Sequence, residues 1–577
     1  MTPHRKDVEK KAGETKSPLI GIGGVNMKKT KYIFAVIPFI LAGLVFTSQA
    51  IPADDTSGKV DTGGEYTLFG KPFTLNGFIT QEFAMGVDPY FSGKNVTDYF
   101  SAQIEWQYKL SDWLSLYGIN RILGDWAYDI HNKSSWFDDA TETPAQHSDA
   151  RDNLAWETNK YDEGWEVFRE LYTDISAGKF RFRLGKQQVI WGESDGLRLM
   201  DCINPQDLRR EFNLRDSDEG YEYTRIPLWL LKMNYFPGVE PFGIRDLNFE
   251  LIVNPGKPKV NRLEAYESEG GVWATEEPNL PTGVRVQLAN KVPRTKIRNA
   301  EVAGRIMGDL NGWLFTLNAF YGRQHDFYLQ PTGPSFCNWD GRFLQLNFDQ
   351  VYDYRKLLGF TLNREMTEIR FRKTTSPVLR VEALYEFDKP FQYEGARVGD
   401  MAWTGLNSQY KQSYKNKDQI RTMIGFDWNI YIRPLNERES FFLSAQFFVF
   451  YNRNQNGQFV NAPFYFSNAV KQQVLPPLPP SRNWKFIDPW RIHQTQKYFS
   501  FLVNTNYMNK RIAPQVLYLL DMEEQAHGLK AKINFNFTSY WRPEIGFIAW
   551  WGEHDTGKSF GLFEKNRQVY AKIKYQF

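Results

Sequence analysis

The chain has 577 residues, a formal net charge of +3, and 16% aromatic residues. A charge this close to balance gives no electrostatic support for nucleic-acid binding, so we expect no nucleic-acid partner. Its two cysteines, Cys202 and Cys337, are too few for a disulfide scaffold, and the sequence leaves open whether they pair.

The first recognisable pattern begins at residue 27. A short stretch with three lysines at 27–31 precedes an uncharged apolar run at 32–46, and small residues then lead to Ala50. This order predicts a secretory signal peptide at 27–50 that is cleaved near Ala50. The alternative is a membrane anchor, but the run is shorter than the roughly 20 residues that a spanning helix needs. The other expected divisions are an upstream extension at 1–26, a periplasmic N-terminal lead at 51–72 and a barrel at 73–577.

Apolar and polar residues alternate in many short segments from Phe73 onward. Alternate side chains of a strand point to opposite faces, so each segment predicts a strand with one apolar and one polar face. The expected strands are 73–87, 100–110, 113–126, 167–177, 180–184, 228–236, 247–253, 302–308, 313–321, 357–362, 379–387, 420–432, 441–449, 499–507, 516–520, 529–537, 545–551 and 569–577.

Connections between these strands alternate in length. Those near 110–113 and 177–180 are short, whereas 127–164 and 452–496 are long and polar. This asymmetry is typical of outer-membrane barrels. A soluble sandwich explains any single strand, but it would need a second inner face to bury so much aromatic surface. We therefore predict an all-β fold, a transmembrane antiparallel barrel of about 14–18 strands in the outer membrane of a Gram-negative bacterium, surrounded by its lipid.

The C-terminal strand alternates up to the last residue. Tyr575 and Phe577 share its apolar face. A terminal aromatic resembles the signal by which outer-membrane barrels are recognised for insertion. We therefore expect the barrel-assembly machinery to be a partner of this strand.

The alternation breaks after Arg183 and resumes near Pro227. Asn204 followed by Pro205 predicts a helix start, with a short helical turn at 206–212. The segment mixes apolar and charged residues, so we predict that 192–227 folds into the lumen and narrows it. The alternative is a surface loop with one helical turn.

The stretch contains the run 185–194, then Ile203, Asn204 and Pro205 with Asp207 and Leu208, and then Pro227 at the start of the next strand. This pattern resembles the signature of a proteobacterial outer-membrane family catalogued as domain of unknown function 1302. The resemblance implies a barrel that handles hydrophobic compounds, with no known substrate. Lys186 and Cys202 stand where the family pattern would have arginine and a small or apolar residue. The residues that we expect to shape the segment are Gly185, Trp191, Gly192, Asn204, Pro205 and Pro227.

Charged residues that flank or lie within the segment are the candidate pore residues. Charge rings in a wet barrel set solute preference. The alternative is that opposite charges pair across neighbouring strands and stiffen the wall. The candidates are Arg181, Arg183, Lys186, Glu193, Asp207, Arg209 and Arg210.

Enzymatic chemistry finds little support. The seven histidines show no metal-ligand spacing, so no metal or cofactor is expected. A Gly-x-Ser-x-Gly motif at 192–196 stands outside the strand–helix context of a nucleophile elbow, and we interpret it as a chance match. We predict a non-enzymatic channel or transporter for small compounds, including hydrophobic ones. The alternative is a receptor or structural barrel that binds a partner through long loops.

Overall fold

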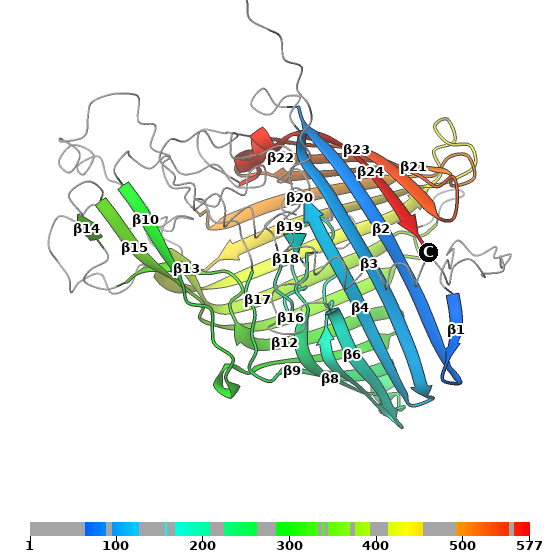
Figure 1. Ribbon diagram of the computed structural model, residues 1–577, viewed down its shortest axis with the longest axis horizontal. Helices are drawn as coiled ribbons and strands as arrows, with labels where there is room; N and C mark the ends of the chain where they lie inside the picture. The colour runs from blue at the N-terminus through cyan, green and yellow to red at the C-terminus, as the bar shows by residue number, and fades with distance from the viewer. Residues whose placement is uncertain are drawn as a thin grey trace, which may run out of the picture.

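The computed structural model describes residues 64–87, 95–125, 156–157, 168–207, 224–261, 284–332, 337–339, 344–369, 375–392, 414–453, 492–552 and 559–577. Within them an 18-stranded antiparallel barrel is closed by pairing of the first wall strand, β2 (Lys71–Gly86), with the last, β24 (Gln568–Gln576) (Figure 1). This confirms the predicted fold, at the upper end of the expected strand number. The predicted extension and signal peptide lie outside the described residues.

Every expected strand is present in the wall. The other wall strands are β3 (Asn95–Ser111), β4 (Leu114–Asp125), β6 (Phe168–Ala177), β7 (Phe180–Gln187), β8 (Leu228–Tyr235), β9 (Ile244–Asn254), β11 (Glu301–Leu310), β12 (Trp313–Arg323), β16 (Tyr354–Glu365), β17 (Val378–Gln392), β18 (Tyr414–Ile430), β19 (Phe441–Asn452), β20 (Thr495–Asn504), β21 (Ile512–Asp521), β22 (Ala526–Phe535) and β23 (Trp541–Trp551).

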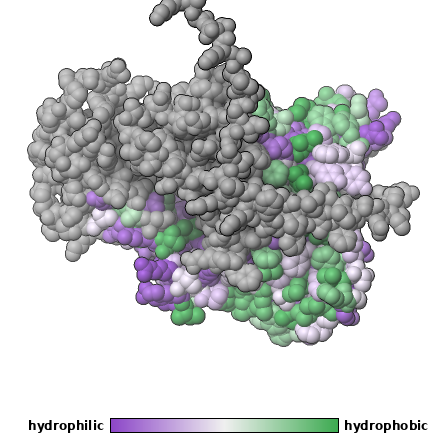
Figure 2. Space-filling model, in the orientation of Figure 1, coloured by the Kyte–Doolittle hydropathy of each residue, from purple (hydrophilic) through white to green (hydrophobic). Residues whose placement is uncertain are grey.

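The wall is apolar outside and polar inside. Leu317 and Ile573 are 49% and 44% exposed, whereas Glu382 and Lys530 are 1% and 2% exposed. Hydrophobic residues cover much of the wall visible in Figure 2. Soluble proteins show the reverse distribution, because they bury apolar side chains and almost never bury charged ones. The outer face therefore matches hydrocarbon, and the inner face surrounds a polar lumen.

The two ends of the barrel differ as the sequence predicts. At the short-turn end, β11 and β12 are joined by Asn311 and Gly312, with φ angles of 54° and 82°. A two-residue turn of this hand needs positive φ at both positions, which Asn and Gly adopt most readily. Asp309 Oδ1 accepts a hydrogen bond from the Gly312 backbone N–H at 2.7 Å. The long connections leave from the opposite, long-loop end.

A small second sheet lies within the β9–β11 and β12–β16 connections, where no strand was expected. Its parallel pair, β10 (Val284–Asn290) and β15 (Leu344–Val351), joins segments far apart in the chain. In Figure 1 this sheet projects from one end of the barrel. Its remaining strands are β13 (Tyr328–Pro331) and β14 (Cys337–Trp339).

The remaining elements are short. Two strands extend the wall: β1 (Gly64–Leu68) pairs with β2, and β5 (Trp156–Glu157) pairs with β4. Among the described residues, no helix has the length and apolarity that crossing a membrane requires. The helical turns are of the 3-10 type, at Pro241–Gly243, Ile297–Asn299 and Ser559–Asn566.

The chain end is fixed in the wall. Backbone hydrogen bonds of 2.9 Å run in both directions between Phe577 and Gly77 on β2. A Cβ atom on Gly77 would lie 2.6 Å from the Phe577 ring, so only glycine leaves room for that ring. Phe577 is 2% exposed and its ring lies 6.2 Å from that of Tyr575. The predicted role of these two aromatics in membrane insertion stays a prediction.

Candidate functional site: a segment folded across the lumen

The chain leaves the wall where β7 ends. Gln187 and Leu228 form the last register pair between β7 and β8. Residues 188–207, which we call the plug segment, turn inward between them. They hydrogen-bond to strands on the far side of the barrel, as described next. The prediction of an in-folded segment is therefore confirmed, and the surface-loop alternative is wrong for these residues.

The Glu382 side chain on β17 binds two backbone N–H groups of the plug segment. One carboxylate oxygen accepts a hydrogen bond from the Glu193 N–H at 2.5 Å, and the other accepts one from the Met200 N–H at 3.1 Å. Hydrogen bonds to a charged carboxylate are among the stronger ones in proteins. Because β8, β9, β11, β12 and β16 separate β17 from β7, these bonds span the lumen.

Asp195 makes the second contact with the far wall. Its Oδ2 atom lies 2.7 Å from Arg380 Nη2 and accepts a hydrogen bond from Gln446 Nε2 at 2.8 Å. Gln446 Oε1 in turn accepts the Asp195 N–H at 2.9 Å. Arg380 also lies 2.7 Å from Asp427 Oδ1. The tip of the plug segment is thus bound to β17 and β19 by charged and amide groups together.

An apolar cluster lies inside the barrel beside these polar contacts. Met200 is 1% exposed, and a Cβ atom on Gly359 of β16 would lie 2.3 Å from its Cε atom. Gly359 therefore provides the space that Met200 fills. The cluster combines plug-segment and inward wall residues: Val189, Trp191, Leu199, Met200, Cys202, Ile203, Leu228, Leu230, Ile252, Ala303, Phe320, Leu357, Leu384, Met423 and Phe448.

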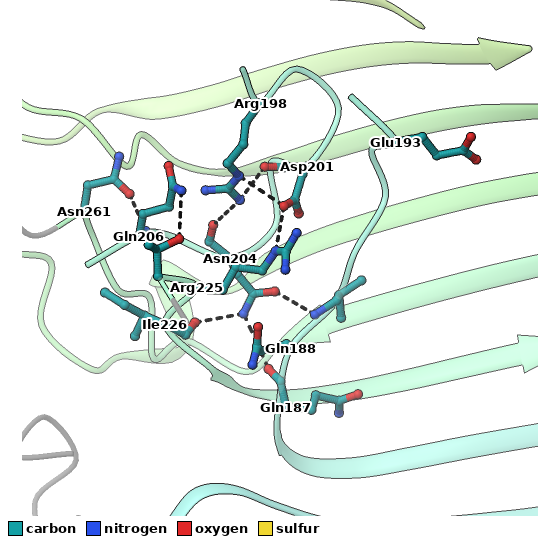
Figure 3. Close-up of polar contacts among 12 residues, drawn as sticks. Gln187, Gln188, Glu193, Arg198, Asp201, Asn204, Gln206, Arg225, Ile226 and Asn261 are labelled. Atoms are coloured by element: carbon teal, nitrogen blue, oxygen red, sulfur yellow. Dashed lines mark hydrogen bonds and ion pairs between the residues drawn. The ribbon is translucent and has the colours of Figure 1, made fainter. Parts of the chain in front are cut away.

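The plug segment also has an internal polar network, drawn in Figure 3. The Asn204 side chain accepts a hydrogen bond from the Val189 N–H at 2.8 Å and donates one to the Ile226 carbonyl at 2.9 Å. Asp201 Oδ2 lies 2.6 Å from Arg225 Nε and 3.1 Å from Arg198 Nε. These contacts join the outgoing and returning arms, so the segment is a folded unit.

The predicted helical turn is wrong where the structure describes it. Gln206 forms a β-bridge with Arg225, and the Asp207 N–H donates to the Thr224 carbonyl at 2.7 Å. Asn204 cannot cap a helix, because its side chain already bonds the two arms of the plug segment. Pro205 accepts a hydrogen bond from the Ile226 N–H at 2.8 Å, which continues this extended pairing.

The predicted pore residues divide into several environments. Arg183 lies 2.7 Å from Asp174 on the neighbouring strand, as the wall-pairing alternative predicts. Arg181 is exposed at the short-turn end, 5.4 Å from the ring of Phe236. Lys186 donates to the Phe168 carbonyl at 2.8 Å, at the end of β6. None of these three contacts involves the plug segment.

The candidates within the segment fare differently. Glu193 accepts a hydrogen bond from Asn363 Nδ2 on β16 at 2.7 Å, so it does reach the far wall. Asp207 lies in the extended pairing described above. Arg209 and Arg210 lie outside the described residues. Glu382, Arg380 and Gln446 are not among the predicted site residues, because the sequence shows only that they lie on the inward face of distant strands.

Besides Asn204 and Pro205, two more of the expected shaping residues, Trp191 and Gly192, contact the wall or the segment directly. Trp191 Nε1 donates to Glu250 Oε1 on β9 at 2.8 Å. A Cβ atom on Gly192 would lie 2.8 Å from the Asp201 backbone nitrogen, so glycine allows the two arms to approach closely. Gly185 lies within β7 with a φ of 135°, a conformation that favours glycine.

The Gly-x-Ser-x-Gly motif does not present an accessible hydroxyl. Ser194 Oγ is buried and makes no hydrogen bond to any described residue. Its neighbours Glu193 and Asp195 are the residues bound to the far wall. Among the residues that the structure describes, no group of three His, Cys, Asp or Glu side chains is placed to hold a metal ion.

Cys202 provides a chemical reporter of the plug segment. It is a free, buried thiol, so the open question of a disulfide with Cys337 is answered in the negative. Burial raises the pKa of the Cys202 thiol to about 11. The Cys337→Ser variant leaves Cys202 as the one thiol of the chain. Because the thiolate is the reactive form, we expect Cys202 in this variant to react with charged thiol reagents at pH 7.5 about two orders of magnitude more slowly than an ordinary cysteine does. Mass spectrometry of the folded and the heat-denatured protein measures this, and equal rates would contradict the buried position.

Asn204 tests whether the two arms act as one unit. Asn204→Ala removes the side-chain hydrogen bonds with Val189, Gln187 and Ile226 and leaves the Val189 N–H unsatisfied, at a cost of about 1–3 kcal/mol. We expect Cys202 labelling to accelerate by about tenfold or more in this variant. Asn204→Asp keeps the acceptor for Val189 but loses the donor to Ile226, so its labelling rate is expected between the two. An unchanged rate in Asn204→Ala would show that these bonds do not hold the segment.

The closed antiparallel wall, its apolar outer face and the segment across its lumen define a channel-like outer-membrane β-barrel. Residues 86–239 match the model of the family described as "Protein of unknown function (DUF1302)". The matched stretch contains β3 to β8 and the plug segment, and it confirms the resemblance noted from the sequence. No curated protein matches the chain.

Several solved outer-membrane proteins are distantly similar. OmpF of Salmonella typhi, in complex with daunomycin, shares 10% identity, with 89% of this chain and 100% of that chain covered and a TM-score of 0.36. OpdK of Pseudomonas aeruginosa, with vanillate, shares 6% identity over 88% and 98%, with a TM-score of 0.41. OccAB3 of Acinetobacter baumannii shares 8% over 88% and 99%, with a TM-score of 0.40. Likeness at this level says nothing of what this chain carries.

Proposed function

We propose that the chain is a channel of the Gram-negative outer membrane that passes small organic compounds through a lumen narrowed by the plug segment. The observation that carries this proposal is the pair of contacts across the lumen, from Glu382 to two backbone N–H groups and from Arg380 to Asp195. A segment bound at its tip by a few polar groups divides the lumen, and it can be released without unfolding the wall.

The proposal includes how the chain reaches its place. A signal peptide at 27–50 is removed near Ala50, and residues 51–72 lead into the barrel. The assembly machinery recognises the last strand through Tyr575 and Phe577. Blocking signal-peptide cleavage in cells is expected to keep the protein out of the outer-membrane fraction. Deletion of Phe577 is expected to lower the amount of folded barrel.

Conductance in planar bilayers tests the channel. Purified protein is expected to give discrete current steps, and silence at every voltage would overturn the proposal. The second candidate, a receptor or structural barrel, is favoured by the small sheet of β10, β13, β14 and β15, which adds a folded surface beyond the wall. Silence in bilayers is its expected result.

A disulfide tests whether the plug segment must move. A Cβ atom on Gly196 would lie 3.4 Å from the Cβ of Ser500 on β20, close to the spacing in disulfides. We expect Gly196→Cys with Ser500→Cys, in a chain whose native cysteines are replaced by serine, to conduct less when oxidised and to recover in reductant. Each single-cysteine variant is the control. Equal current in both redox states would show that compounds pass a fixed plug.

A further inference from the structure

A layer of charged and aromatic side chains lies next to the plug segment, on its long-loop side. The inward residues of β17 follow in order toward that end: Glu382, which binds the plug segment, then Leu384 in the apolar cluster, then Glu386. Arg421 on β18 is the register partner of Leu384 and of Phe450 on β19, and its guanidinium extends to Glu386. A solute that enters from the long-loop end therefore meets Glu386 before it reaches Glu382 and the contacts that hold the tip of the plug segment.

Positive charge is in excess in this layer. Glu386 lies 3.2 Å from Arg355 Nε and 3.0 Å from Arg421 Nη2. Lys389 lies three residues beyond Glu386 on β17, and its Nζ donates a hydrogen bond to Gln419 Oε1 at 2.7 Å. The carboxylate of Asp326 also interacts electrostatically with Lys389. Among the described residues, these three cations thus face two carboxylates, so the layer favours an additional negative charge.

Hydrogen-bond donors are also in excess. Each guanidinium carries five N–H donors. Glu386 is their shared carboxylate, and it already accepts a hydrogen bond from Gln324 Nε2 at 2.9 Å. The Nε atom of Arg421 is buried, and no described residue accepts a hydrogen bond from it. A ligand with two or more acceptor oxygens would satisfy donors that the described residues leave open.

Aromatic rings form the side of the layer next to the cations. The Arg421 guanidinium lies 5.9 Å from the Phe450 ring centre, and Phe450 lies 5.3 Å from the Tyr498 ring. Phe560 follows at 6.4 Å from Tyr498, and Trp550 at 5.5 Å from Phe560. These rings give an apolar surface that begins where the cations end. A ligand that uses both needs an anionic group attached to an apolar body.

We propose that this layer is a binding site for small organic anions with a ring-containing apolar body. The carboxylate of such a ligand bonds to Arg355 and Arg421, and its body packs against Phe450 and Tyr498. This inference rests on the proposed channel function and deepens it, because it names the class of solute that is gathered beside the plug segment.

Calorimetric titration of the folded, detergent-solubilised protein with benzoate tests the site. We expect saturable binding of benzoate and at least about tenfold weaker binding of the neutral analogue benzamide, because benzamide lacks the charge. Arg421→Gln is expected to weaken benzoate binding by about tenfold or more. Arg453→Gln is the matched control, since it removes an exposed guanidinium near the long-loop end, and no change is expected.

Glu386→Gln gives a result of opposite sign. It removes the competing carboxylate and is expected to tighten benzoate binding, whereas a merely structural role would weaken it. Heat-modifiable gel migration selects variants that are folded. Equal affinities of the parent protein for benzoate and benzamide overturn the site. A folded Arg421→Gln or Glu386→Gln variant that binds benzoate with the affinity of the parent also overturns it. Binding without any bilayer current supports the site and overturns the channel, while current without binding does the reverse.

Discussion

Glu382→Ala is expected to increase the open-channel current and to make it fluctuate. The substitution removes both hydrogen bonds that hold the backbone of Glu193 and Met200 to β17. Hydrogen bonds to charged groups contribute about 1.5–3 kcal/mol each, so the loss of two shifts the bound-to-released ratio of the plug segment by about a hundredfold or more. Single-channel recording in planar bilayers measures the result. Glu382→Gln keeps an acceptor oxygen without the charge and is expected to give an intermediate current.

Glu365→Ala is the matched control for this experiment. It also removes a carboxylate from β16–β17, but its side chain is exposed at the short-turn end and makes no described contact with the plug segment. Its current is expected to equal that of the parent. If Glu382→Ala behaves like the control, the plug segment is held by its apolar cluster, and the polar contacts do not determine passage.

The alternation of residues predicted the wall well because its cause is local. Lipid contacts every second residue of a strand, whatever the rest of the chain does, so the pattern is visible in segments such as 420–432 and 569–577. The small sheet was missed because lipid does not impose this alternation on its strands. The strands β10 and β15 are short, lie at the long-loop end and pair with each other across a long stretch of chain.

The path of the plug segment was only partly predictable. Its departure from alternation after Arg183 showed where the chain leaves the wall. Its binding partners did not show, because Glu382 and Gln446 lie on strands far away in sequence. Asn204 illustrates the difficulty: followed by Pro205 it has the local features of a helix start, but tertiary contacts with Val189 and Ile226 use its side chain otherwise. Local propensity is a weak guide where such contacts decide.

Leu317→Lys is expected to destabilise the barrel by about 2–4 kcal/mol in lipid vesicles, because a lysine at mid-wall on the outer face must enter hydrocarbon. Leu317 is 49% exposed on β12. Its neighbour Thr316 faces the polar lumen, where its hydroxyl lies 2.8 Å from that of Thr361. Thr316→Lys therefore introduces the same charge one residue away, and its expected cost is about 1 kcal/mol, from the lost hydrogen bond.

Denaturant titration in phospholipid vesicles, followed by tryptophan fluorescence and gel migration, compares the two lysine variants. The contrast between them, and not either value alone, decides what surrounds the wall. General loss of packing would affect both variants, whereas hydrocarbon penalises only the outward lysine. If Thr316→Lys proves as costly as Leu317→Lys, the outer face is not solvated by lipid. The exposure of Leu317 and the burial of Glu382 would then require another explanation.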